Sequence, residues 1–419
     1  MIATLANFRI LVVCLMAMSV ALPIALISLA KLLLLLCALA LLLFERRRPV
    51  SSSVPGRTWS PAIILGALLA MALSLLWSSG PGTEPFVALA KHGKLVLVAL
   101  LLFLLRSRRE ALLALAAFGV GQLFLLGSTG LLLLGATLPW ARANLEPSSH
   151  AVFSSYLDQS MMSATFGAVC WHLRGLLPGR HGRLVASGVA ALALLCVFFV
   201  FQARTGHLIA IAVISLAILW QLPVRFRAAA ALVPLVVALL FSAGSATVRD
   251  RLHAAADEVQ AFSQSGDVST SSGIRLNLWQ RSVQSVAQRP WAGSGVGSWY
   301  HEFDKLQKRN APGVWVDFHG NPHQEFLLWS VELGLPGAAL LCAVLTGFCR
   351  DGAMGDSATS RATLSVVAAL LIACLFNCAL YDALIGDFFC VVIGLLLALA
   401  AHPGAMASTL APAPATASS

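Results

Sequence analysis

The chain has 419 residues, of which 58% are hydrophobic and 11% charged, and its formal net charge is +10. A water-soluble domain is about one quarter charged, so this composition excludes a soluble globular protein and indicates a chain surrounded by lipid. The positive charge would suit a nucleic-acid partner, but most of the basic residues lie where membrane topology would place them, so we expect membrane lipids and no nucleic acid as partners.

Twelve apolar runs approach the length of about 20 residues that a helix needs to cross a bilayer. The first run is interpreted as a retained helix rather than a signal peptide, because Arg9 is the one basic residue before it and apolar sequence continues through Leu43. The chain is therefore predicted to be an all-α integral membrane protein. The predicted spans are 8–23, 25–44, 61–77, 90–105, 110–135, 159–175, 184–203, 206–221, 228–243, 323–348, 362–381 and 385–401.

The basic residues are distributed among the loops between these spans as the positive-inside rule requires. If the N-terminus is cytoplasmic, every inside loop is basic, whereas the short outside connections carry almost no positive charge. We therefore predict about twelve spans in a bacterial-type inner membrane, with both termini in the cytoplasm. The inside arginines are Arg46, Arg47, Arg48, Arg57, Arg106, Arg108, Arg109, Arg174, Arg180, Arg183, Arg225, Arg227, Arg350 and Arg361.

One long polar stretch interrupts the spans. The predicted organisation is transmembrane helices in 1–243, a large, partly helical periplasmic loop in 244–322, three more spans in 323–401, and a disordered cytoplasmic tail in 402–419. The loop has a positive excess that topology does not require, which indicates an anionic ligand. Within it the run Gly293 to Gly297 predicts a tight turn.

The sequence does not indicate a metal or redox site. All nine cysteines lie in or at the ends of apolar runs, so neither disulfides nor a zinc site is predicted. Asp317, Glu325 and Glu332 share a neighbourhood but lack the spacing of a metal site, so we expect a metal-free site and no cofactor. Asp382 and Asp387 flank a short outside turn and are interpreted as helix-end residues, with a proton relay as the alternative.

The segment that enters the tenth span carries the candidate catalytic group. Asn321 is a good N-cap, Pro322 suits the first helical position, and Gln324 completes a capping box, which places His323 in the first helical turn. The helix dipole disfavours imidazolium there, so a neutral His323 could accept a proton from a hydroxyl. A histidine that merely bonds water or backbone is the alternative. His319 is a weaker candidate for the same role.

Two arginines outside the cytoplasm are candidates for binding an anion. Arg204 lies between two predicted spans, where a guanidinium fork suits phosphate, although snorkelling to the interface is the alternative. Arg275 lies at the start of a short predicted helix, with Trp279 one turn later. This pair could bind a glycan or phosphate; the alternative is that it packs the loop onto the membrane. Lys91 and Lys94 add positive charge on the same predicted side.

Taken together, these features resemble the superfamily of O-antigen ligases and O-antigen polymerases, which are membrane glycosyltransferases with a GT-C-like helical fold. The resemblance covers about half of the chain. The matching motifs are Trp77-Ser78, the region from Lys91 to Lys94, Gln202-Ala-Arg-Thr-Gly206, Gly273-Ile-Arg-Leu-Asn-Leu-Trp279 to Gly293-Ser-Gly-Val-Gly297, and Asn321-Pro-His-Gln-Glu-Phe-Leu running into Glu332-Leu-Gly-Leu-Pro-Gly337.

The resemblance implies a ligase that transfers a glycan from undecaprenyl diphosphate to a sugar hydroxyl of the lipid A core in the periplasm, without metal and with inversion. It implies that His323 acts on the acceptor hydroxyl and that Arg204 and Arg275 bind the diphosphate. The expected substrate-binding residues are Lys91, Lys94, Trp279, His319, Asn321 and Gln324. A polymerase or a protein O-oligosaccharyltransferase of the same superfamily is the alternative. A lipid-linked oligosaccharide flippase is disfavoured because the charges cluster at one outer surface.

Overall fold

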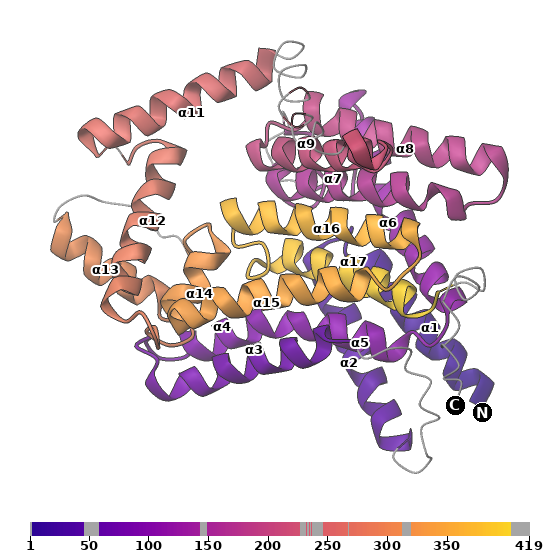
Figure 1. Cartoon of the computed structure of the whole chain (residues 1–419), viewed down its shortest axis with the longest axis horizontal. Coiled ribbons are helices and arrows are strands. Elements are labelled where there is room, and N and C mark those ends of the chain that lie inside the picture. The colour runs from indigo at the N-terminus through magenta and orange to yellow at the C-terminus, as the bar shows by residue number, and fades with distance from the viewer. Residues whose placement is uncertain are drawn as a thin grey trace, which may run out of the picture.

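The computed structural model describes residues 2–45, 58–142, 149–226, 246–266, 268–311 and 320–403, with the single positions 232, 234 and 236. All regular secondary structure in this part of the chain is helical. Most helices pack side by side into one bundle, and α11, α12 and α13 lie together at one end of it (Figure 1).

In chain order the helices are α1 (Ile2–Ser19), α2 (Ile24–Glu45), α3 (Ser60–Ser74), α4 (Glu84–His92), α5 (Val96–Leu104), α6 (Arg108–Leu133), α7 (Tyr156–Leu173), α8 (Gly179–Phe199), α9 (Arg204–Leu219), α11 (Ala246–Ser265), α12 (Ser271–Gln288), α13 (Trp299–Asn310), α14 (Glu325–Leu333), α15 (Leu335–Gly352), α16 (Ser357–Phe376) and α17 (Ala383–Ala401). Short 3-10 turns extend α3, join α4 to α5 and follow α7.

Among the described residues, seven helical segments are long and apolar enough to cross a membrane, judged by length and composition. They are Ile24–Leu43, Ser60–Trp77, Glu84–Leu104, Arg108–Leu133, Gly179–Phe199, Ser357–Phe376 and Ala383–Ala401. Asn7–Ser19 and Arg204–Leu219 are shorter apolar helices at two further predicted spans. A multi-pass membrane protein is therefore confirmed, whereas the count of twelve is not. The predicted span 228–243 lies almost entirely outside the described residues.

The predicted span 323–348 is two helices rather than one. The chain turns at Gly334, whose φ is +72° and whose Cβ, if present, would lie 2.5 Å from the carbonyl oxygen of Pro290. A continuous helix is therefore interrupted, and α14, with nine residues, is about 14 Å long and too short to span a bilayer. The prediction of one continuous span was wrong because Gly334 ends α14 with a positive φ and Pro336 lies at the start of α15.

The centre of the bundle is α17, of which 89% is buried among α5, α6, α15 and α16. On its other side α16 packs against α7 and α9. Residues 159–169 of α7 are all buried, including Gln159, Ser160 and Thr165, so the polar composition of this helix reflects packing against protein rather than lipid.

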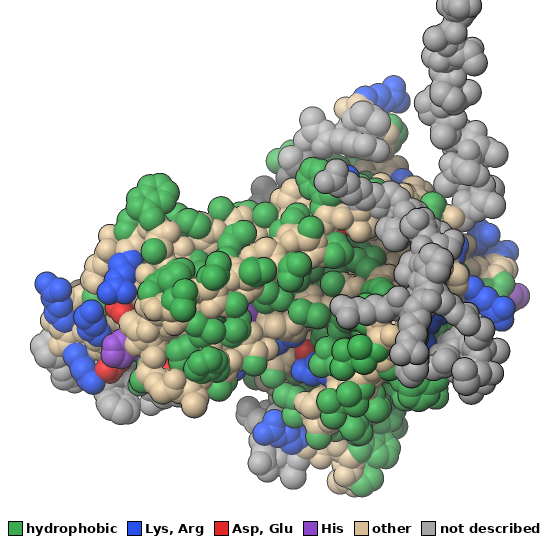
Figure 2. Space-filling view, turned by 90° about the horizontal axis from the view of Figure 1, so that it is seen from below, with side chains coloured by type: hydrophobic (Ala, Val, Ile, Leu, Met, Phe, Trp, Pro, Cys, Tyr) green, Lys and Arg blue, Asp and Glu red, His purple; other side chains and the backbone are tan. Residues whose placement is uncertain are grey.

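The two ends of the bundle differ in chemistry. At one end Arg9 pairs with Glu110 at 2.6 Å and Arg108 pairs with Asp356 at 2.8 Å. Apolar side chains cover much of the outer surface between the ends, whereas Lys and Arg gather mainly at the left and right of the view in Figure 2. Arg204 and His323, two of the candidate residues singled out from the sequence, lie at the opposite end from Arg9 and Arg108, where α7 and α9 begin and α16 ends.

Candidate functional site

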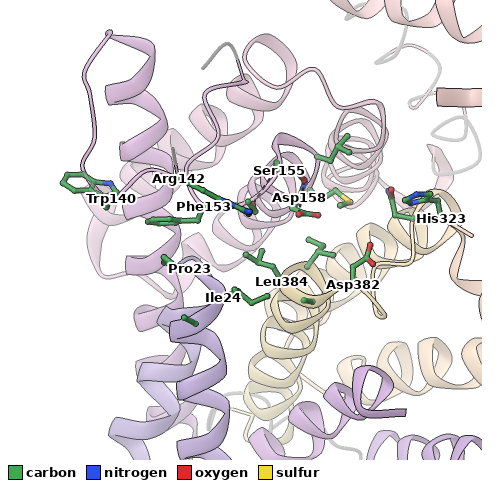
Figure 3. Close-up of a pocket in the computed structure, with 17 residues that line it drawn as sticks. Pro23, Ile24, Trp140, Arg142, Phe153, Ser155, Asp158, His323, Asp382 and Leu384 are labelled. Carbon is green, nitrogen blue, oxygen red and sulfur yellow. Dashed lines mark hydrogen bonds between the residues drawn. The ribbon is translucent and has the colours of Figure 1, made fainter. Parts of the chain in front are cut away.

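A cavity of about 810 Å³ opens at this end of the bundle. Its wall is formed by the turn between α1 and α2, the segment before α7, the segment before α14, and the connection from α16 to α17. Figure 3 shows His323 and Asp382 on one side of it, with Arg142 extending toward Asp158 from the other. Acidic, basic and imidazole groups therefore share one concave space.

His323 lies before α14 in a left-handed conformation with φ of +51°. Its backbone N–H donates to Oδ1 of Asn321 at 2.9 Å, which forms a tight turn. The helix begins two residues later, and its N-cap is Gln324, whose side chain accepts from Leu327 N at 2.5 Å. The predicted capping box was wrong, because Asn321 uses its acceptor on the turn and the chain cannot enter a helix through a left-handed residue.

Contacts from two other elements hold this turn in place. The indole N–H of Trp279 donates to the carbonyl oxygen of Pro322 at 3.0 Å, and Asn321 Nδ2 donates to Asp382 Oδ1 at 2.8 Å. A left-handed residue other than glycine costs free energy and persists where the surroundings fix it, and such residues cluster at functional sites. The histidine is thus positioned in the cavity wall by α12 on one side and the α16–α17 connection on the other.

Arg204 is the first residue of α9, and its guanidinium meets a carboxylate. The Glu258 side chain lies 3.3 Å from Nη2, and Ser272 Oγ accepts from Nη1 at 2.8 Å. Burial acts in the opposite direction, but the bonds from Ser272 and Arg204 hold the pKa of Glu258 below its usual value. The two side chains are 27% and 20% exposed, so an anion from outside could compete for this fork.

Arg275 lies on α12, half-buried and close enough to Arg204 for the two charges to interact. Burial, followed by repulsion from Arg204, lowers the pKa of the Arg275 guanidinium. No hydrogen bond from this guanidinium is recorded among the residues that the structure describes. Two cations 71 positions apart in sequence are thus brought together with one nearby carboxylate, Glu258, which leaves net positive charge at the site.

The arginine pair adjoins the cavity without lining it. Thr205, next to Arg204, accepts from Asn377 Nδ2 at 3.2 Å, and Asn377 is part of the cavity wall. On the α7 side, Tyr156 interacts electrostatically with Arg275 and stands between two wall residues of the cavity. Positive charge at the arginines therefore lies beside the cavity whose wall contains His323.

The other predicted binding residues have different surroundings. Lys91 is exposed, with its ammonium 4.3 Å from the centre of the Tyr381 ring. Lys94 is buried and donates to the carbonyl oxygens of Tyr381 and Asp382 at 2.9 and 2.6 Å, so it supports the α16–α17 connection from beneath. His319 lies outside the described residues.

Asp382 is a site residue whose role the sequence analysis missed. It occupies the N-cap position of α17 but makes no capping hydrogen bond; instead it accepts from Asn321. Burial, and then the neighbouring Glu325 and Asp158 carboxylates, raises its pKa to about 7. Asp387 differs, since it lies within α17 and pairs with Lys31 at 2.7 Å.

A second missed feature is the buried pair of His92 and Glu332, whose side chains are 2.8 Å apart and 1% and 0% exposed. The other carboxylate oxygen of Glu332 accepts from Gly297 N at 2.8 Å. This pair connects α4, α14 and the turn before α13. No local spacing joins residues so far apart in the chain, so the sequence carries no signal for it.

Among the described residues, no group of three or more His, Cys, Asp and Glu side chains comes together as a metal site would require. Metal independence of the chemistry stays a prediction.

The O-antigen ligase family model matches residues 189–342, from within α8 to within α15, a range that includes Arg204, Arg275 and His323. No curated protein matches the chain in sequence.

Proposed function

We propose that this chain, a member of the O-antigen ligase and polymerase family, is a ligase that transfers a glycan from undecaprenyl diphosphate to a sugar hydroxyl of the lipid A core. The observation that carries the proposal is the conjunction of a rigidly held His323 in a cavity wall with two interacting arginines beside that cavity. The reaction takes place at the periplasmic face of the inner membrane, since the opposite end of the bundle carries the predicted inside arginines.

In the proposed reaction the acceptor hydroxyl lies in the cavity within reach of His323. The imidazole takes the hydroxyl proton as the oxygen attacks the anomeric carbon, and the bond from that carbon to the diphosphate oxygen breaks. A direct displacement of this kind inverts the configuration at the carbon.

The leaving diphosphate gains negative charge as its bond breaks. Arg204 and Arg275 meet that charge with guanidinium donors fixed in a partly buried place, where they need little reorganisation. The diphosphate competes with the Glu258 carboxylate for the guanidinium of Arg204. The diphosphate of the lipid-linked donor therefore takes the place of an anion that is already bound there.

A polymerase would use the same groups, with a second lipid-linked glycan as acceptor in place of the core. A protein O-oligosaccharyltransferase would accept a serine or threonine hydroxyl. The three differ in what enters the cavity, so the acceptor decides among them.

The test is a transfer assay with purified protein, a lipid-diphosphate glycan, and three acceptors supplied separately: lipid A with its core, the same lipid-linked glycan, and a serine-rich peptide. We expect a glycan attached to the core, formed equally well in the presence of a strong chelator. A longer lipid-linked glycan would make the protein a polymerase. Transport of the donor across vesicles without a covalent product would make it a flippase.

A further inference from the structure

Two adjoining cavities lie at the end of the bundle opposite the candidate site. The first, of about 280 Å³, lies between the ends of α7 and α9 and the start of α16. Three arginines line it, namely Arg174, Arg183 and Arg361, and no acidic side chain is among its lining residues. The hollow is therefore strongly positive.

Its position follows from the helices that form it. α7 begins beside the catalytic cavity at Tyr156, whereas Trp171 and Arg174 at its other end line the basic hollow. With 18 residues, α7 separates the two places by about 27 Å along its axis. The hollow thus belongs to the opposite membrane surface, where the predicted inside arginines lie.

The arginines of the hollow have no carboxylate partner in the part of the chain that the structure describes. The Arg174 guanidinium lies 3.8 Å from the centre of the Trp171 ring, a stacking contact that leaves its charge uncompensated. Arg174 and Arg361 both act electrostatically on His172, a buried residue that lines the hollow, so both charges lie close to the same place. Unneutralised charges gathered in this way favour an anion.

The second cavity, of about 320 Å³, continues the first along α7, α8 and α9. The two share Trp171, His172, Ala217 and Gln221. Beyond those, the second cavity has small and apolar walls, which include Gly167, Ala190 and Leu194. It is a groove with room for hydrocarbon and little to bind a polar group.

The groove also adjoins the outer surface of the bundle. Leu184, Leu192 and Leu195 of α8 are each at least half exposed, as expected for side chains that face lipid. α8 is thus both a wall of the groove and part of the lipid-facing surface, and a lipid tail can pass between the two without crossing water.

We propose that the two cavities together bind one anionic phospholipid, with its phosphate among Arg174, Arg183 and Arg361 and an acyl chain in the groove between α7, α8 and α9. Basic pockets between membrane helices at the cytoplasmic side suit anionic headgroups. The apolar groove that leads directly from the arginines distinguishes a phospholipid from a free phosphate ion. This binding site is independent of the transfer chemistry at the other end.

The test is native mass spectrometry of the purified full chain with added phosphatidylglycerol or, as the neutral comparison, phosphatidylcholine with the same acyl chains. The parent should retain phosphatidylglycerol in preference. Replacing all three lining arginines, as Arg174→Gln, Arg183→Gln and Arg361→Gln, should lower the affinity on the order of 100-fold, from about fivefold for each charge. Unchanged retention by this variant would overturn the proposal.

The matched control removes the same charge from the same end at residues that do not line the hollow, as Arg109→Gln, Arg180→Gln and Arg225→Gln. It should bind phosphatidylglycerol nearly as the parent does, and an equal loss would show generic attraction instead of a site. If the triple pocket variant fails to fold, Arg361→Gln alone replaces it, with a loss of about fivefold expected.

The acyl chain is tested separately by Ala217→Trp, which fills the point where the two cavities meet. This variant should lose phosphatidylglycerol although all three arginines remain. Excess inorganic phosphate should displace the lipid poorly from the parent. Normal lipid binding by Ala217→Trp together with full displacement by inorganic phosphate would reduce the site to an anion site and contradict the proposal.

Discussion

His323 combines a chemical and a conformational requirement in one residue. Its imidazole belongs to the cavity wall, and its backbone adopts a left-handed conformation fixed by Asn321 and, through Pro322, by Trp279. Substitution by alanine changes both properties at once. Asparagine removes the imidazole but tolerates left-handed backbone well, so it separates the two.

We expect His323→Ala and His323→Asn to reduce transfer by about 10²–10⁴-fold, the usual effect of removing a general base. The asparagine variant should keep the parent's thermal stability in detergent, whereas alanine should lose some. Initial rates and unfolding temperatures of the same preparations measure both. Near-parental turnover by the asparagine variant would remove His323 from the chemistry and leave it as a structural turn.

The residue types of the site could be predicted from the sequence, but the contacts around them could not. An arginine between two apolar runs and a histidine before an apolar run are visible as local patterns. The bond from Asn321 to Asp382 joins residues 61 positions apart, and nothing in local spacing indicates it. The capping prediction failed because the Asn321 side chain accepts from His323 N–H within the turn, and Trp279 and Asp382 fix that turn from distant parts of the chain.

Asp382 should make stability depend on pH. Burial and nearby carboxylates raise its pKa to about 7 from an ordinary value of 3.8. Between these two values the folded protein binds more protons than the unfolded chain, so stability falls as pH rises through this range. Asp382→Asn keeps an oxygen that can accept from Asn321 but does not titrate. We therefore expect a smaller decrease in unfolding temperature between about pH 4 and pH 7 in the variant. Parallel profiles would contradict the assignment.

At the scale of elements, the turn between α12 and α13 holds the polar segment against the bundle. The sequence predicts this turn from its glycines, and the structure confirms it with positive φ at Gly293, Gly295 and Gly297. Ser78 Oγ donates to Val296 O at 2.7 Å, so the turn is attached to the chain that follows α3. The attachment could not be predicted from the sequence, because Ser78 and Val296 lie far apart in the chain.

Gly295→Ala should disrupt this attachment. With φ of +88° an added Cβ would overlap Ser78, so overpacking of about 1–3 kcal/mol adds to about 1 kcal/mol of left-handed strain. The control is Gly82→Ala, where φ is +56° but the space around the new Cβ is open. We expect a clearly larger drop in unfolding temperature for Gly295→Ala than for the control. Equal effects would mean that the close approach to Ser78 contributes nothing.

The helices themselves were largely predictable, because apolar length fixes most of them. α2, α3, α6, α8, α16 and α17 lie close to their predicted ranges. The exception is the tenth predicted span. Its hydropathy predicts one continuous helix, whereas the structure has two helices, α14 and α15, on either side of Gly334. Hydropathy reports on the average environment of a segment, whereas this break lies at one glycine with a positive φ, which packs closely against Pro290.

The proposed reaction requires that the two ends of the bundle face different compartments. In a cysteine-free variant, a membrane-impermeant thiol reagent should label an introduced cysteine at Ser265 from the periplasm. A cysteine at Ser52 should react after permeabilisation and not before, since Ser52 lies among the predicted inside arginines. The reverse labelling would invert the topology and move the cavity that contains His323 to the cytoplasm.

In the proposed reaction Arg204 and Arg275 act together on the diphosphate of a lipid-linked donor. The most direct measurement is the rate of glycan transfer to lipid A core by Arg204→Lys and Arg275→Lys, each with a strong chelator present. Lysine keeps the positive charge but loses the planar pair of donors. We predict that each variant loses most of its transfer rate while the parent is unaffected by the chelator. Parental rates in both lysine variants, or loss of parental activity restored by added Mg²⁺, would contradict it.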